Sequence, residues 1–272
     1  MGEEQVLGVT KAVNWLLAKP ALALFALLHV TPDNPQYPIP NFFACELLVV
    51  LASVIFFLWL KGRISADRPG GTQQVMEMVL TNPMGVGVKD LIDDIVGHGN
   101  DRHIAMMGTI AIFILFCNLA GLIPNLMSPT ADKTVPLGCA TIVFLYYNWY
   151  GVVKHGAGGY ALTWLGPVKN LIVIIMLPVE TISHFARLLS LTVRLWANIM
   201  VGEMLYLSFL GLSVALLAFA SHASPIGYIA AVVPVGIPML LIVFHIFEAL
   251  LQAFIFTILA IIYLSLAVAE EH

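Results

Sequence analysis

The sequence predicts an all-α integral membrane protein with about five transmembrane helices, one amphipathic helix on the membrane surface, and a final hairpin of two long, strongly tilted helices. Three observations predict this class. Only 10% of the 272 residues are charged and 60% are hydrophobic, whereas average soluble domains carry roughly 25% charged residues. Several apolar runs reach the roughly 20 residues that cross a bilayer as a helix. The last two apolar runs are about twice that long.

We interpret the first segment, 1–41, as an interfacial segment on the outer side of the membrane. It starts with Glu3 and Glu4 where a signal peptide would be basic, and Lys11 and Pro20 are among the residues that interrupt its apolar run. These features argue against both a signal peptide and a first span. They are typical of an amphipathic segment that lies at the membrane surface.

The middle of the chain is predicted to hold three spans and one surface helix. The spans are expected at 42–61, 104–123 and 137–153, and the surface helix at 70–97. The surface helix mixes apolar residues with five charged ones, which makes it too polar to span. Lysine and arginine outside the spans number seven on one side and three on the other. By the positive-inside rule, the N-terminus is outside and the C-terminus is cytoplasmic.

The two long helices are predicted at 170–220 and 229–269. At 1.5 Å per residue these segments of about 50 and 41 residues would be roughly 75 and 60 Å long, twice the hydrocarbon thickness. The first has no cluster of glycine and proline near its midpoint. We therefore expect two tilted helices joined by residues 221–228, rather than four short spans.

Polar side chains follow one stripe of the first long helix. At 100° per residue, five of them fall within about 80° of one another: Glu180, His184, Arg187, Arg194 and Asn198. On the second long helix His245, Glu248 and Gln252 fall within about 60°, while Glu203 lies off the first stripe. One interpretation is that these residues pair to hold the helices together. The whole pattern favours an ion path, in which a fixed cation and titratable groups have separate tasks.

Several other classes of function are excluded or unsupported. The net charge of −4 leaves no basic patch for nucleic acid. The sequence contains neither a phosphate-binding G-x-x-x-x-G-K-[ST] loop nor the H-E-x-x-H zinc motif, and we expect no cofactor and no metal. A secondary proton or cation antiporter remains an alternative, although such a protein would be expected to have an inverted repeat and broken helices in both halves.

The residues of the long helices resemble those of a known family. The sequence SLTVRLWAN at 190–198, followed by Gly202 and Glu203, is similar to the signature of subunit a of F-type ATP synthases. The sequence from His245 through Gln252 to Leu264 is similar to the last helix of that family. The stretches 118–124 and 129–132 resemble its middle segments, so the resemblance covers nearly all of the chain after residue 40.

The resemblance implies a stator subunit that stays fixed while a ring of c subunits turns against it, with two offset half-channels that carry protons to and from the ring. Arg194 would be the stator charge facing the ring carboxylates, with Asn198 one turn away. Glu203, His245 and Gln252 would line or shape the outer half-channel.

Glu248 has no counterpart in the family pattern and is expected to be an extra relay or a partner of His245. Glu180, His184 and Arg187 are expected to make supporting polar contacts, and the alternative for His184 and Arg187 is that they line the inner half-channel.

The resemblance also implies the protein's surroundings. The partners would be the c-ring, the peripheral stalk subunit b, the rest of the ATP synthase complex and membrane lipid. The chain would not be an enzyme on its own. Its location would be the bacterial inner membrane.

Overall fold

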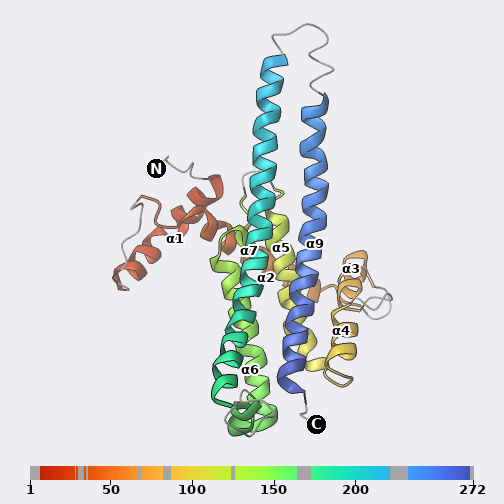
Figure 1. Cartoon of the computed structure of the whole chain (residues 1–272). Helices are drawn as coiled ribbons and strands as arrows, with labels where there is room; N and C mark the ends of the chain where they lie inside the picture. Colours follow the sequence, from red (N-terminus) through yellow and green to blue (C-terminus); the bar gives the residue numbers. More distant parts are fainter. Residues whose placement is uncertain are drawn as a thin grey trace. The chain divides into compact units, whose positions relative to one another are not determined.

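The computed structural model describes residues 7–27, 29, 34, 36–65, 69–81, 87–123, 126–163, 173–220 and 232–269. In these ranges the regular structure is helical, and no β-strand occurs (Figure 1). The helices are α1 (Gly8–Leu27), α2 (Asn41–Lys61), α3 (Gly71–Leu80), α4 (Val88–Ile95), α5 (Ile104–Ala120), α6 (Thr134–Thr163), α7 (Val173–Ala220) and α9 (Val232–Val268). Two 3-10 turns, η1 (Asp101–His103) and η2 (Pro129–Ala131), precede α5 and α6. The predicted all-α class is confirmed.

Four helical stretches of the described chain are long and apolar enough to cross a membrane. They are Asn41–Lys61, Asp101–Ala120, Pro178–Ala218 and Gly236–Val268. The fifth predicted span, 137–153, lies inside α6, which is not one of the four. Its insertion in the membrane therefore stays a prediction.

The helices α7 and α9 are unbroken over 48 and 37 residues, as their lengths of apolar sequence predicted. Pro178 and Pro238 lie within the first two turns of α7 and α9. A proline there removes one hydrogen bond and permits a kink, but it leaves the rest of the hydrogen-bond ladder intact. The predicted connection at 221–228 lies outside the described residues.

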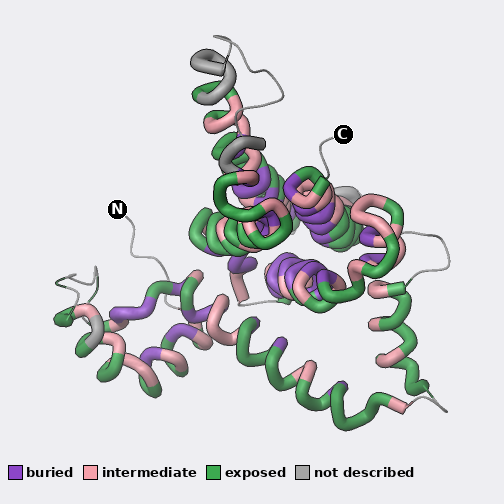
Figure 2. The backbone as a smooth tube through the Cα atoms, turned by 90° about the horizontal axis from the view of Figure 1, so that it is seen from below, coloured by how far each residue is buried: buried purple, intermediate pink, exposed green. Residues whose placement is uncertain are grey.

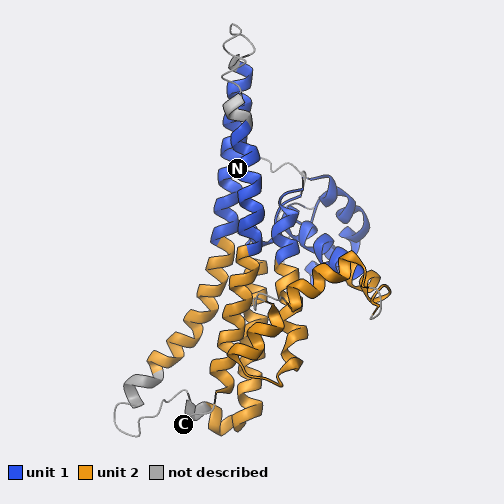
Figure 3. Ribbon diagram, turned by 90° about the vertical axis from the view of Figure 1, so that its right-hand side faces the viewer, with its two compact units in different colours: residues 1–55, 115–132, 197–250 blue, residues 56–114, 133–196, 251–272 orange. Residues whose placement is uncertain are grey.

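The chain divides into two compact units (Figure 3). Unit 1 comprises residues 1–55, 115–132 and 197–250, and unit 2 comprises residues 56–114, 133–196 and 251–272. Because the units are interleaved in the sequence, α7 and α9 each contribute one half to each unit. In unit 1 the two halves lie side by side and run in opposite directions (Figures 1 and 3).

In unit 1 the helix α1 is held to the start of α2 by buried amides. The Nδ2 of Asn14 donates to the carbonyl of Ile39 at 3.0 Å, and the N–H of Ile39 donates to the Oδ1 of Asn14 at 3.0 Å. The hydroxyl of Thr10 donates to the Oδ1 of Asn41 at 2.8 Å. Trp15, which follows Asn14, is 89% exposed. The polar side chains on one face of α1 are thus hydrogen-bonded within the protein, while Trp15 is exposed. The position of α1 at a membrane surface stays a prediction.

In unit 2 the segment predicted as one surface helix, 70–97, forms two helices instead. The helix α3 ends at Leu80, the backbone of the next residue Thr81 is extended, and α4 begins after Gly87. The sequence between them contains Pro83, and proline disfavours helical backbone at the residue before it. Val88, Leu91 and Ile92 of α4 are buried, whereas α3 has no buried residue.

The helix α6 contains a sharp break at Gly156. Gly156 has φ 72° and ψ 159°, a region of the backbone map that is essentially restricted to glycine. The chain then folds back, so that the Tyr160 hydroxyl donates to the Oδ1 of Asn148 at 2.9 Å. Gly151 leaves the space that the Tyr160 ring fills.

Burial is uneven along single helices (Figure 2). In the candidate span that contains α5, 56% of the most apolar stretch is buried inside the protein, against 11% for α7. More than half of this stretch of α5 is thus covered by the protein itself, whereas most of the corresponding stretch of α7 is not.

Candidate functional site

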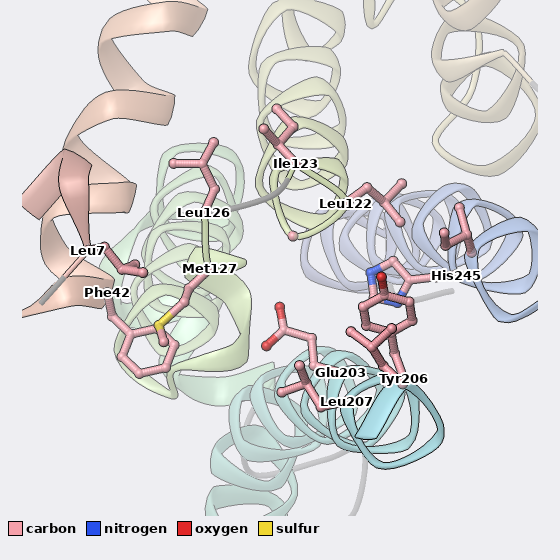
Figure 4. A pocket seen from close by; sticks show the side chains of 13 residues that line it. Leu7, Phe42, Leu122, Ile123, Leu126, Met127, Glu203, Tyr206, Leu207 and His245 are labelled. Atoms are coloured by element: carbon pink, nitrogen blue, oxygen red, sulfur yellow. The ribbon is translucent and has the colours of Figure 1, made fainter. Parts of the chain in front are cut away.

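A cavity of about 520 Å³ lies within unit 1 (Figure 4). Its wall is mostly apolar and comes from the residue before α1, from α2, from the chain after α5 and from facing halves of α7 and α9. The polar side chains in the wall are Glu203 and Tyr206 of α7 and His245 of α9. In Figure 4 the carboxylate of Glu203 and the imidazole of His245 both point into this space. Two of the predicted site residues therefore share one cavity.

The carboxylate of Glu203 is fixed by the chain that follows α5. The backbone N–H of Ser128 donates to its Oε1 at 3.0 Å. A Cβ atom at Gly121 would lie only 2.8 Å from the same oxygen, closer than real carbon atoms approach. The glycine therefore provides the space in which the acid sits.

Buried hydroxyl and amide groups hold Ser128 in turn. Its hydroxyl lies 2.7 Å from that of Thr130 and 3.0 Å from the carbonyl of Cys117. The hydroxyl of Thr130 donates to the Oδ1 of Asn118 at 2.6 Å, and the Nδ2 of Asn118 donates to the carbonyl of Ala249 at 3.5 Å. This set of contacts links α5, the chain after it and α9 within unit 1.

The helices α7 and α9 approach each other closely at Gly202. A Cβ atom there would lie 2.8 Å from the Oε2 of Glu248 and 3.4 Å from the Nδ1 of His245. His245 is only 6% exposed, and its Nε2 has no hydrogen-bond partner among the described residues. The missing side chain of Gly202 is what allows both titratable groups of α9 to lie against α7.

Arg194 and Asn198 lie one turn apart on α7, and both are exposed. Arg194 belongs to unit 2 and Asn198 to unit 1. Within the described part of its own unit, the guanidinium of Arg194 forms no ion pair with a carboxylate. Gln252 of α9, also in unit 2, is buried at 1% exposure.

Glu180, His184 and Arg187 form a cluster in unit 2. The Oε1 of Glu180 lies 3.5 Å from the Nε2 of His184 and 3.8 Å from a guanidinium nitrogen of Arg187. The guanidinium also lies over the ring of Tyr263, 5.7 Å from its centroid, a cation–π contact that joins α7 to α9. His184 and Arg187 thus both contact Glu180, and the predicted supporting role of the three residues stays a prediction.

Comparison with known proteins adds the deciding observation. The model of the family described as ATP synthase A chain matches residues 43–265. The chain belongs to this family. It is therefore a membrane subunit of an F-type ATP synthase and part of that complex.

Three relatives illustrate the extent of the match. The chain is 36% identical to ATP synthase subunit a of Koribacter versatilis over 97% of both chains. It is 36% identical to ATP synthase subunit a of Solibacter usitatus, over 94% of this chain and 98% of that one. The identity to the Helicobacter pylori subunit is 34%, over 88% of this chain and 99% of that one.

Within this chain, the sequence-predicted site residues fall into separate groups. Glu203 and His245 share the cavity, and His245 and Glu248 converge on Gly202. All three belong to unit 1, whereas Arg194 and Gln252 belong to unit 2. No group of three potential metal ligands occurs in the described part of the chain.

Sequence reasoning missed the residues that hold Glu203 in place. All three are 0% exposed: Ser128, Thr130 and Asn118. The stretches that contain Asn118 and Thr130 resemble segments of the family, but the sequence predicts no role for any of the three residues. The signal that could have found them is a run of small polar residues between two apolar helices, since such residues are buried only when they find partners.

Proposed function

We propose that this subunit is the proton-conducting stator of the membrane sector, which provides two offset half-channels to and from a rotating c-ring during ATP synthesis. The observation that carries the proposal is the cavity of unit 1, where Glu203 and His245 face one apolar space. Ionisable groups in a membrane segment are costly, and they mark ion pathways. In a chain of this family, such a pair is well suited to accept and release protons.

Arg194 is proposed as the stator charge. A guanidinium keeps its proton under all conditions found in proteins, so it stabilises the ionised form of a facing ring carboxylate and blocks direct proton leakage. Its exposure on α7 and the absence of an ion pair with the described residues of its unit support this role, because the charge stays available for a partner. Asn198, one turn along the same exposed face, would organise that surface.

Glu203, His245 and Gln252 are proposed to form or shape the outer half-channel. The cavity supplies a volume that Glu203 and His245 share, and the burial of Gln252 is consistent with a role in shaping the path. Glu248 is proposed as an additional relay next to His245, since both approach Gly202. Glu180, His184 and Arg187 would support the two helices through the contacts of His184 and Arg187 with Glu180 and through the contact of Arg187 with the Tyr263 ring.

The proposed partners are the c-ring and the peripheral stalk subunit b. The proposed orientation places the N-terminus outside and the C-terminus in the cytoplasm of a bacterial inner membrane. The subunit would conduct protons without catalysing a reaction on its own.

The test is Arg194→Ala in the complete complex. We expect inverted membrane vesicles that carry this variant to lose ATP-driven proton pumping, measured by quenching of a pH-sensitive dye, while the variant still assembles with the ring. Arg63→Ala is the matched control, because Arg63 is an exposed arginine at the end of α2 that lies over Trp59. Pumping by Arg194→Ala at the wild-type rate would contradict the proposal.

Purification in mild detergent tests the proposed partners. The subunit should co-purify with the c-ring and the peripheral stalk, and isolation without either of them would contradict the proposed partners.

A further inference from the structure

A buried latch lies next to the proposed proton-carrying acid. We define the latch as the side chains of Asn118, Ser128 and Thr130, which are all 0% exposed and all belong to unit 1. The Oδ1 of Asn118 at the end of α5 accepts from the hydroxyl of Thr130 at 2.6 Å, and the hydroxyl of Thr130 lies 2.7 Å from that of Ser128. The latch therefore ties the chain after α5 back to α5 itself.

The latch keeps a hydrogen bond to α5 whichever way its two hydroxyl hydrogens point. Ser128 and Thr130 have one hydroxyl hydrogen each, and they face two outside acceptors, the carbonyl of Cys117 and the Oδ1 of Asn118, as well as each other. If Thr130 donates to Asn118, Ser128 can donate either to Thr130 or to Cys117. In each arrangement at least one hydrogen bond joins the segment to α5.

The latch ends at the carboxylate of Glu203. The backbone N–H of Ser128, whose side chain the latch holds, donates to Glu203 at 3.0 Å. Gly121 brings this segment close to α5, because a Cβ atom there would lie 3.0 Å from the Cβ of Ser128 and 2.8 Å from the Oε1 of Glu203. The position of one N–H donor relative to the acid thus depends on the latch.

We propose that Thr130 is a positioning residue for proton transfer, which acts by holding the N–H of Ser128 on the carboxylate of Glu203. This inference rests on the proposed role of Glu203 in the half-channel. A hydrogen bond to an ionised group is roughly twice as strong as one between neutral groups. In an apolar cavity it decides where the carboxylate points.

Other titratable groups around Glu203 do not replace this contact. They are Tyr206 of the same helix, His245 of α9 and Cys45 of α2. None of them belongs to the latch, so a change at Thr130 removes the positioning without removing a titratable group from the cavity.

The test compares Thr130→Val with Thr130→Ser in the assembled complex in membrane vesicles, with pumping normalised to the amount of subunit. Valine keeps the shape and removes the hydroxyl, whereas serine restores it. We expect Thr130→Val to lower ATP-driven proton pumping by about fivefold or more, which corresponds to the loss of one hydrogen bond, and Thr130→Ser to pump at close to the wild-type rate. Thr141→Val is the matched control, because Thr141 is half-buried and its hydroxyl donates within its own helix, to the carbonyl of Leu137.

A double variant separates positioning from general damage. In the background of Glu203→Gln, the change Thr130→Val should cause no further loss, since the acid that it positions is gone. An added loss in the double variant, failure of the serine to restore pumping, or normal pumping by Thr130→Val would each overturn the inference.

Further variants distinguish poor assembly, and failure of the proposed role of Glu203, from failure of the inference about Thr130. If Thr130→Val assembles poorly, Ser128→Ala replaces it, because it removes the second hydroxyl and leaves the N–H in place; normal pumping by Ser128→Ala would then overturn the inference. If Glu203→Gln itself pumps like the wild type, the proposed role of Glu203 fails, and the latch inference fails with it. If Glu203→Gln is impaired and Thr130→Val is not, only the latch inference fails.

Discussion

Replacing Gly202 by alanine is expected to displace the carboxylate of Glu248. The new Cβ atom would lie 2.8 Å from the Oε2 of Glu248, whereas ordinary contact begins at 3.4 Å. The oxygen must therefore move by about 0.6 Å. A displacement of about 1 Å in a reacting group can cost on the order of a hundredfold in rate, so we expect a loss of roughly tenfold here.

The fold should tolerate this change. The atom that must move is the far end of a flexible side chain, and the Nδ1 of His245 at 3.4 Å already lies at an ordinary contact distance. We therefore expect normal assembly together with slow ATP-driven pumping in inverted vesicles. Gly108→Ala is the matched control, because its Cβ would lie 2.7 Å from the Cδ2 of Leu80 and would push only an apolar group.

The effect should depend on the carboxylate itself. In the background of Glu248→Ala, the change Gly202→Ala should add little, because the oxygen that it displaces is absent. Wild-type pumping by Gly202→Ala, or equal losses in the Gly202 and Gly108 variants, would refute the idea that Glu248 works from this position.

Two predictions concern the stability of the subunit. Asn14→Ala should leave the N–H and the carbonyl of the buried Ile39 without their partner, at a cost of about 1–3 kcal/mol each. We expect hydrogen exchange of peptides that cover Ile39 to speed up at least tenfold. The control Lys11→Ala changes an exposed residue of the same helix and should leave this exchange unchanged. Gly156→Ala should destabilise α6 by about 1–3 kcal/mol, because its φ of 72° and ψ of 159° strain any residue with a side chain. A thermal melt of the purified complex measures that cost, and a similar melting temperature for Gly156→Ala and for the control Gly158→Ala, which has open space and no positive φ, would contradict it.

The polar stripe of α7 illustrates the limit of helical phase as a predictor. Ideal geometry groups Glu180, His184, Arg187, Arg194 and Asn198 within one stripe. In the structure His184 is buried and pairs with Glu180, whereas Arg194 and Asn198 are exposed. Helical phase predicts the direction in which a side chain points from the helix axis. Neighbouring helices decide which residues along one stripe are buried and which stay exposed.

The sequence by itself determined the membrane class, the two uninterrupted long helices and the family. These depend on apolar length, on the positions of proline and glycine and on local motifs, which need no knowledge of what lies nearby. Only the tertiary structure decided that Asn14 holds Ile39, that the latch reaches Glu203, and that Gly202 makes room for Glu248. Each of these contacts joins residues far apart in the chain, and whether a buried polar group is satisfied depends on a partner that local sequence does not specify.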